Sequence, residues 1–318
     1  MTATNALPER EAANSPHDQL VRLVSEWVPE SGGRTTAIEG LDLYRSDTPT
    51  HCESSVYEPS MTFAIQGAKS IQLGDREIVQ GPLTYLASNV SLPVLGQIVD
   101  ATPEQPALAA RLTVDPQEVT DLVLASGDRL PAFDPDEACP DMACGLCTAP
   151  MDDAMQVALL RLLSLLDTPA DIPVLAPLAR REILYRALTG EIGPRIRKFA
   201  ATDSQVYRVS RVIATLKDRY AQPLRVSDLA GEVNMSESSL FHSFKQVTRM
   251  SPLQFQKKLR LHEARRLMLA EGLEAAAASY RVGYESPSQF SREYRRLFGA
   301  PPRADVTKLR GGAEPARA

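Results

Sequence analysis

The 318-residue sequence predicts an α+β fold in two parts, a small β-barrel or sandwich with a helical extension followed by an all-α C-terminal module. Two observations predict this division. Between Thr36 and Val114 apolar and polar residues alternate with period two, which is typical of half-buried strands. Beyond Val114 the apolar residues recur at helical spacing, and one helical pattern occurs twice, displaced by 50 residues.

The N-terminal part is expected to place its strands after a tail and one helix. Residues 1–16 are polar and without periodicity, which predicts a disordered tail. The domain itself is expected over residues 17–200, opening with an amphipathic helix from Asp18 to Val28. The barrel should cover about 34–115, where Gly74-Asp75 is typical of a hairpin loop with glycine at its first central position.

Helices are expected from about 116 to 200. Asp115 and Pro116 are typical of a helix start, and this helix should end near Ala125. A helical apolar stripe then consists of Met155, Leu159, Leu162, Leu163 and Leu166. The stretch 169–177 holds several prolines and should end that pattern before a helix over 178–188 and a short one near 194–200. This helical pair either covers the barrel or packs across a dimer.

The C-terminal module, expected over 205–303, contains the duplicated pattern. Each copy has a short apolar helix, a tight turn and a second helix, so helix-turn-helix units are expected at 226–248 and 274–298. The matched positions are Ser236 and Ser286, Leu240 and Phe290, Phe244 and Tyr294, Val247 and Leu297, and Pro252 and Pro302. One long helix of roughly 27 Å, from Pro252 to Leu269, should join them. Residues 304–318 are expected to form a flexible tail.

Charge is distributed unevenly between the two parts. From residue 205 onward there are 20 Lys and Arg against 11 Asp and Glu, which gives +9. Residues 1–204 hold 15 against 29, which gives −14, and the sum is the overall −5. A positive module on an acidic chain indicates the part that meets nucleic-acid phosphates, although basic residues also solvate helix faces.

A set of residues at fixed spacing runs through both copies of the pattern. Its members are Leu229-Ala230, Met235-Ser236, Leu240, Phe244-Lys245, Ser251-Pro252-Leu253, Leu261, Ala264-Arg265-Arg266-Leu267, Val282-Gly283-Tyr284-Glu285-Ser286, Gln289-Phe290-Ser291-Arg292, Tyr294 and Phe298-Gly299. Through them about a hundred residues resemble the AraC/XylS family of bacterial transcription regulators.

Three further segments extend the resemblance to residues 34–200, which look like the sensory domain of one AraC-type subgroup. They are Val56-Tyr57-Glu58-Pro59-Ser60, Leu92-Pro93-Val94 and Arg181-Glu182-Ile183-Leu184-Tyr185-Arg186. The resemblance implies a cupin-like barrel, activation of transcription through contacts with RNA polymerase, and a homodimer as one option.

The resemblance also implies which side chains read DNA bases. The matching positions are Ser238, Phe241 and His242 in the first unit, and Ser288, Gln289 and Arg292 in the second. Family members often carry Arg where this chain has His242, so readout by the first unit is expected to be weaker or differently tuned. Phe241 either touches a thymine methyl or belongs to the core, and His242 is alternatively a solvated histidine. Arg292, with guanine as its partner, is the foremost candidate.

Six basic side chains of the module are candidate phosphate anchors, with ordinary surface charges as the alternative. They are Lys245, Arg249, Lys257, Arg281, Arg295 and Arg296. The long helix could hold two recognition helices about one DNA turn, ~34 Å, apart, so that one chain enters successive major grooves of a bent duplex.

Four cysteines allow a second hypothesis. Cys52, Cys139, Cys144 and Cys147 could bind zinc or sense redox state, but their spacing matches no strong zinc signature, and spectator thiols are the simpler interpretation. No nucleophile elbow, Walker loop, dinucleotide fingerprint or His-Glu-x-x-His run is present, and the barrel region holds one histidine, His51. The sequence therefore predicts a ligand-sensing pocket rather than an enzyme, and no cofactor.

The predicted function is an effector-responsive, sequence-specific regulator that binds promoter DNA and activates nearby genes. The first alternative is a redox- or metal-responsive cupin-type protein, an enzyme or a thiol sensor, with a DNA-binding appendage. The second is a constitutive architectural protein that bends DNA. Expected partners are double-stranded DNA, RNA polymerase and a small-molecule effector, with no membrane association. Since neither a signal peptide nor a bilayer-spanning run is evident, the expected location is the cytoplasm.

Overall fold

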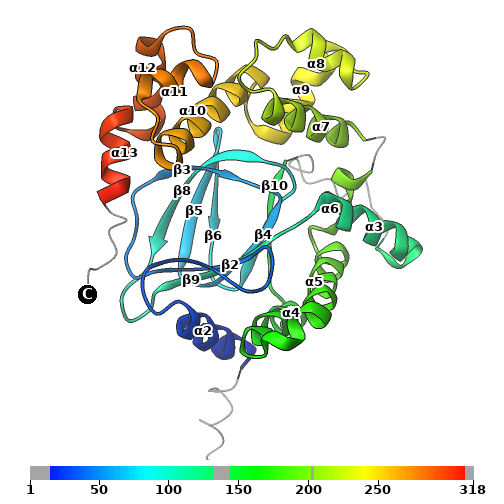
Figure 1. The fold of residues 1–318 in the computed structure, drawn as a ribbon. Helices are drawn as coiled ribbons and strands as arrows, with labels where there is room; N and C mark the ends of the chain where they lie inside the picture. The colour runs from blue at the N-terminus through cyan, green and yellow to red at the C-terminus, as the bar shows by residue number, and fades with distance from the viewer. Residues whose placement is uncertain (1–14, 132–143, 202–203, 312–318) are drawn as a thin grey trace, which may run out of the picture.

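The computed structural model describes residues 15–131, 144–201 and 204–311. The N-terminal part consists of two antiparallel sheets with helices against them, and the C-terminal helices lie across one end of the sheets (Figure 1). The helix near the N-terminus lies at the opposite end (Figure 1). The α+β class expected from the sequence is confirmed.

The strands form a six-stranded and a four-stranded sheet. The first has the order β1-β2-β9-β4-β7-β10 and the second the order β3-β8-β5-β6. Their bounds are β1 Gly32–Thr35, β2 Leu41–Ser46, β3 Glu53–Tyr57, β4 Ser60–Gln66, β5 Ala68–Leu73, β6 Arg76–Gln80, β7 Thr84–Ser88, β8 Leu92–Asp100, β9 Ala107–Thr113 and β10 Leu146–Pro150. The predicted hairpin loop joins β5 to β6, where Leu73 pairs with Arg76.

Within the described ranges these sheets remain open at their edges and do not close into the expected barrel. The chain passes from one sheet to the other at Gly67, between β4 and β5. The pairing register shifts on both sides of this glycine, and its φ is +75°. A Cβ there would lie 2.6 Å from the Asp100 carbonyl oxygen, so only glycine allows the corner. Bulges of this kind bend strands from one sheet into the next.

Three helices cover the outer face of the six-stranded sheet. They are α2 Pro16–Trp27, α4 Asp153–Ser164 and α5 Ile172–Thr189. Ser15 accepts a hydrogen bond from the Asp18 amide and so caps α2. Leu20, Phe63 and Ile183 are buried in the shared core, so the apolar stripes of these helices face the sheet. Most of the expected tail 1–16 lies outside the described residues.

Two local expectations were wrong. The helical pattern is interrupted after Asp167, as expected, but the second helix begins at Ile172 rather than at residue 178, so that α5 contains Pro177. This proline sits in the second turn, where one missing N–H bond is offset by burial of Ala176 and Ala179. Residues 146–150 lie in the stretch where helices were expected, but they form β10, which pairs with β7. Two shorter helices, α3 Pro116–Ser126 and α6 Gly193–Ala200, agree with the sequence pattern.

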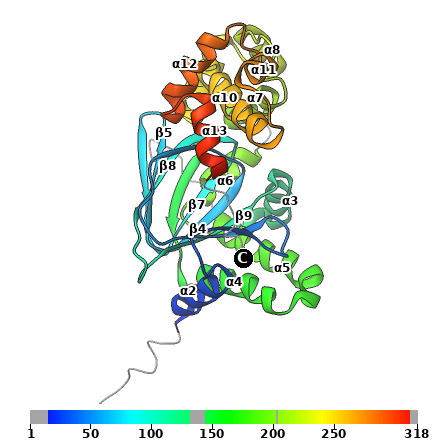
Figure 2. The same cartoon turned by 60° about the vertical axis from the view of Figure 1, so that its left-hand side comes forward.

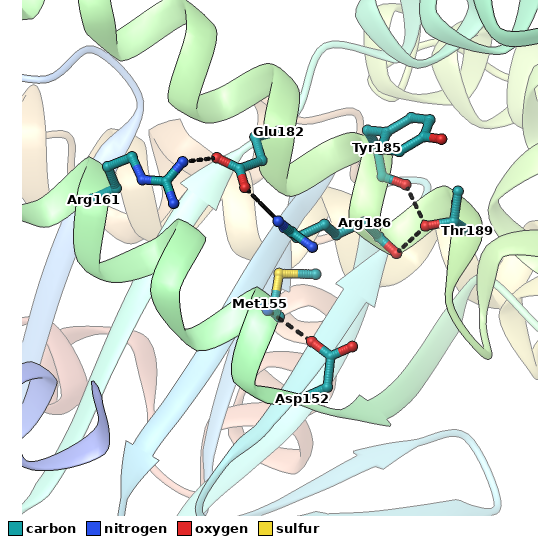
Figure 3. Close-up of polar contacts among 7 residues, drawn as sticks. All are labelled: Asp152, Met155, Arg161, Glu182, Tyr185, Arg186 and Thr189. Carbon is teal, nitrogen blue, oxygen red and sulfur yellow. Dashed lines mark hydrogen bonds and ion pairs between the residues drawn. The ribbon is translucent and has the colours of Figure 1, made fainter. Parts of the chain in front are cut away.

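Part of the sensory-domain resemblance is explained by the packing of α5 on α4 (Figure 3). Glu182 accepts hydrogen bonds from Arg161 of α4 at 2.7 Å and from Arg186, one turn along α5, at 2.6 Å. Asp152 accepts from the Met155 amide at 2.7 Å and caps α4. The segment 181–186 therefore joins these two helices.

No single described helix is long and apolar enough to span a bilayer. The bent pair Asp153–Asp167 and Pro169–Thr189 has the length and composition of a span only when its two helices are taken together.

The C-terminal part is entirely helical. Its helices are α7 Gln205–Asp218, α8 Val226–Glu232, α9 Glu237–Thr248, α10 Pro252–Ala270, α11 Ala275–Arg281, α12 Pro287–Phe298 and α13 Pro302–Gly311. The last corrects the expected tail at 304–318, because Asp305 is buried and accepts hydrogen bonds from Arg265 and Tyr294. Residues 312–318 lie outside the described ranges.

Candidate nucleic-acid interface

The pairs α8–α9 and α11–α12 have the same local construction. Each has a helix of 7 residues followed by one of 12. Ser236 and Ser286 cap the longer helices by accepting hydrogen bonds from the amides of Ser239 and Gln289. The longer helices both end at a residue in the left-handed region, Arg249 and Gly299.

The longer helices bury one face and expose the other. Leu240, Phe244 and Val247 of α9 are buried, as are Phe290 and Tyr294 of α12. The six expected base-reading residues are all exposed, namely Ser238, Phe241, His242, Ser288, Gln289 and Arg292. Phe241 has 48% of its surface exposed, so the alternative of a core residue does not hold.

Neighbouring side chains orient several of these residues. Gln246 lies within hydrogen-bond distance of the His242 ring at 3.0 Å, and Gln289 donates to Glu293 at 3.1 Å. Lys257 and the Tyr284 hydroxyl also donate to Glu293. Burial opposes ionisation of Glu293, but these hydrogen bonds hold its pKa below the ordinary value.

The candidate phosphate anchors differ in their exposure and in their ion pairs. Lys245, Arg295 and Arg296 are exposed and have no ion pair within the described residues. Lys257 pairs with Glu293 at 3.0 Å and Arg281 with Glu271 at 2.9 Å. Arg249 is half-buried, with its backbone against the loop between β5 and β6.

Comparison with known proteins identifies the family. Residues 37–195 match the model of the AraC-type transcriptional regulator N-terminus, which is half of the chain, and residues 229–306 match a helix-turn-helix domain. This chain belongs to the AraC family of transcriptional regulators.

Two curated AraC-family relatives match part of the chain. The transcriptional regulator ArgR of Pseudomonas aeruginosa is 28% identical over 106 residues, which is 33% of this chain and 32% of that protein. The transcriptional activator RhaS of Citrobacter koseri is 28% identical over 138 residues, 43% of this chain and 47% of that protein. The chain thus spans a third to a half of the length of these relatives.

Solved structures of ToxT from Vibrio cholerae resemble the chain over most of its length. The wild-type protein with an unsaturated fatty acid bound is 12% identical, with a TM-score of 0.52 over 86% of this chain and 97% of that chain. An apo variant is 10% identical, with a TM-score of 0.53 over 86% of this chain and 100% of that chain. These likenesses show a shared fold.

In this AraC-family chain the helices of the DNA-binding part lie against one end of the sheets (Figure 2), and several side-chain and backbone contacts join the two parts. The Gly145 amide donates to the Val247 carbonyl at 3.0 Å. Lys217 of α7 donates to Glu58 at 2.7 Å and to Ser91. Ser54 of β3 is 3.0 Å from the His262 ring of α10. Burial, with Arg265 and Lys258 nearby, lowers the pKa of His262 to about 4. Sequence analysis did not find this junction, although Glu58 lies in a segment that carried the resemblance.

The thiols do not form a metal site within the described residues. Cys52 is exposed, whereas Cys144 and Cys147 are buried. Burial raises the pKa of Cys147 to about 12, so its thiol stays protonated and is a poor nucleophile. Cys139 lies outside the described residues. The fold of this AraC-family member therefore lends no support to a metal- or redox-responsive alternative.

Proposed function

We propose that this chain is a sequence-specific transcriptional regulator whose α9 and α12 act as the recognition helices of two helix-turn-helix units. One observation carries the proposal: two 12-residue helices of the same construction keep their polar residues exposed while one helix, α10, joins their cores. Short polar side chains and a guanidinium on an exposed helix face suit base edges in a major groove.

The length of the joining helix α10 sets the separation of the two units, and this separation is close to one turn of DNA. With 19 residues, α10 is about 28 Å long, which is close to the ~34 Å turn of a duplex. Its first half packs in the core of the first unit through Phe255, and its second half packs in the core of the second through Leu267. A rigid connection of this length favours successive major grooves and a modest DNA bend.

The test is Arg292→Ala in the full chain. We expect operator binding to weaken by ~1–3 kcal/mol with discrimination lost at one base pair, because arginine reads guanine with two hydrogen bonds. A titration against duplexes varied at each position measures this. Arg22→Ala is the control, since it removes the same charge from exposed α2 at the other end of the molecule (Figure 1). Unchanged base preference in Arg292→Ala contradicts the assignment.

We further infer that the sheets bind a small acidic effector. A cavity of about 580 Å³ lies between the two sheets, within the size range of ligand sites. Its charged lining residues are Arg45, Glu53, Lys69 and Arg111. Arg45 pairs with Asp47 and Arg111 with Asp42, so Lys69 is the basic lining group without an ion pair among the described residues. The Nε of Arg111 is buried without a hydrogen-bond partner in the described residues, which leaves a polar group to be satisfied. ToxT, whose fold the chain shares, was solved with an unsaturated fatty acid bound, and this supports an acidic effector.

Binding of small carboxylic acids can be followed by saturation-transfer NMR on the full chain. We expect binding to weaken in Lys69→Met and to persist in Lys308→Met, which removes an exposed lysine from α13. Equal binding by both variants contradicts a site between the sheets.

Three finer elements belong to the same proposal. The chain activates transcription through RNA polymerase, as the family resemblance implies, and it acts in the cytoplasm. It forms a homodimer through α5, where Val174, Leu178 and Tyr185 are exposed on the surface.

A further inference from the structure

We propose that Glu293 is a positioning residue that sets the base preference of α12 by orienting Gln289. This inference rests on the proposed function and names a determinant of its specificity. Glu293 lies one turn after Gln289 and faces the same side of the helix. Its Oε1 accepts from Gln289 Nε2 at 3.1 Å and from Lys257 Nζ at 3.0 Å, and its Oε2 accepts from the Tyr284 hydroxyl at 2.8 Å.

The three donors come from different elements, so the carboxylate has a fixed position. Tyr284 is buried in the turn before α12, and its ring packs edge-on against Phe290 at 5.4 Å. Lys257 belongs to α10, whose apolar residues pack in the cores of both units. Glu293 therefore connects the turn, the joining helix and the exposed face of α12.

The consequence for Gln289 follows from the two ends of its amide. A carboxylate accepts hydrogen bonds but donates none, so the NH₂ end of Gln289 must face Glu293. The carbonyl oxygen and the second N–H of this amide have no hydrogen-bond partner among the described residues. Adenine offers one acceptor and one donor in the major groove, N7 and the N6 amino group, and a glutamine amide matches both. An amide already oriented loses less rotational freedom on binding.

The first unit lacks this arrangement. The positions in α9 that correspond to Gln289 and Glu293 are Ser239 and Ser243. Ser243 is buried and donates to Gln205 of α7 at 2.8 Å, so it points away from the exposed face. Removing Glu293 should therefore change one half of the operator only.

The experiment is selection of random duplexes by the full chain, followed by sequencing, for the wild type, Glu293→Ala and Tyr284→Phe. In Glu293→Ala we expect preference to fall roughly fivefold or more at one base pair of the half bound by α12, with the other half unchanged. Tyr284→Phe removes one of the donors that fix the Glu293 carboxylate but leaves the bond to Gln289, so its preference should fall by less than that of Glu293→Ala. Glu293→Gln keeps an acceptor for Gln289 and should restore part of the preference.

The salt dependence of DNA binding gives a second readout. If Glu293 had only a structural role, its loss would not strengthen binding to unrelated DNA. Loss of the carboxylate frees Lys257 for phosphate, so binding of Glu293→Ala to unrelated DNA should strengthen and depend more steeply on salt. Equal weakening on all sequences, or altered preference in both halves, overturns the inference. Wild-type protein without any base preference contradicts the proposed function itself. If the wild type shows a base preference and Glu293→Ala selects the same sequences, this inference is wrong but the proposed function stands.

Discussion

The two helix pairs share a local pattern but differ in their support. The core of α8–α9 is continuous with the sheets, since Leu240 and Phe244 belong to one buried cluster with Leu92 and Leu146. The core of α11–α12 is a separate cluster formed with the second half of α10 and with α13. A repeated sequence pattern has thus produced one unit attached to the sensory domain and one unit that packs largely on itself.

The contacts with the sheets explain this difference. The first unit meets them at Gly74, where a Cβ would lie 2.4 Å from the Arg249 carbonyl oxygen, and at Gly145, whose amide donates to the Val247 carbonyl. Near the second unit, Ser54 of β3 lies within hydrogen-bond distance of His262 of α10, and α12 itself lies close to β3 without sharing a buried core with the sheets. An effector that moves the sheets should therefore act on α9 through a shared core and on α12 through the smaller contact at β3.

The largest expected effect is the loss of stability when a buried ring is removed from either of the two cores. Phe244→Ala and Phe290→Ala each remove a fully buried ring and should lower the free energy of unfolding by ~3–5 kcal/mol. Hydrogen exchange should show lost protection in both α9 and the sheet strands for Phe244→Ala. For Phe290→Ala the loss should remain within α11, α12 and α13. Identical exchange maps for the two variants would show that the clusters are one cooperative unit.

Acid should weaken the contact between α10 and the sheets. The pKa of His262 is about 4 in the folded protein against an ordinary 6.5, because of burial and then of Arg265 and Lys258. The unfolded chain therefore binds a proton first as pH falls, and stability declines between pH 6.5 and 4, by roughly 3 kcal/mol at most. Urea unfolding from pH 7 to 4.5 measures this. His262→Gln should flatten the pH dependence, and an equal slope in both proteins refutes the assignment.

A glycine pair tests the attachment of the first unit with the smallest expected effect. Gly74 and Gly127 both have positive φ, +63° and +50°. A Cβ at Gly74 would lie 2.4 Å from the Arg249 carbonyl oxygen, whereas a Cβ at Gly127 meets nothing within 4 Å. Gly74→Ala should cost ~1–3 kcal/mol more than Gly127→Ala and increase proteolysis near residue 249. Equal behaviour of the two variants argues against a tight junction.

Much of the local structure could be predicted from the sequence. Ser236 and Ser286 mark helix starts because a hydroxyl at that position satisfies a free backbone amide, and the apolar spacing after each serine defines a buried face. These signals are local, so the exposed positions of Gln289 and Arg292 followed from them. The prediction that the second helix starts after Pro177 was wrong, because packing that the local sequence does not reveal outweighs the helix-breaking tendency of this proline.

The sequence by itself determined the fold class, the two equivalent helix pairs and the uneven charge, since each depends on residues close together in the chain. Only the tertiary structure decided that α13 extends past residue 303, that Cys147 lies in a strand, and that the first pair shares a core with the sheets. It also decided that Glu293 collects donors from Lys257, Tyr284 and Gln289. These features depend on which distant segments meet, because burial and hydrogen-bond partners are set by packing and not by spacing along the chain.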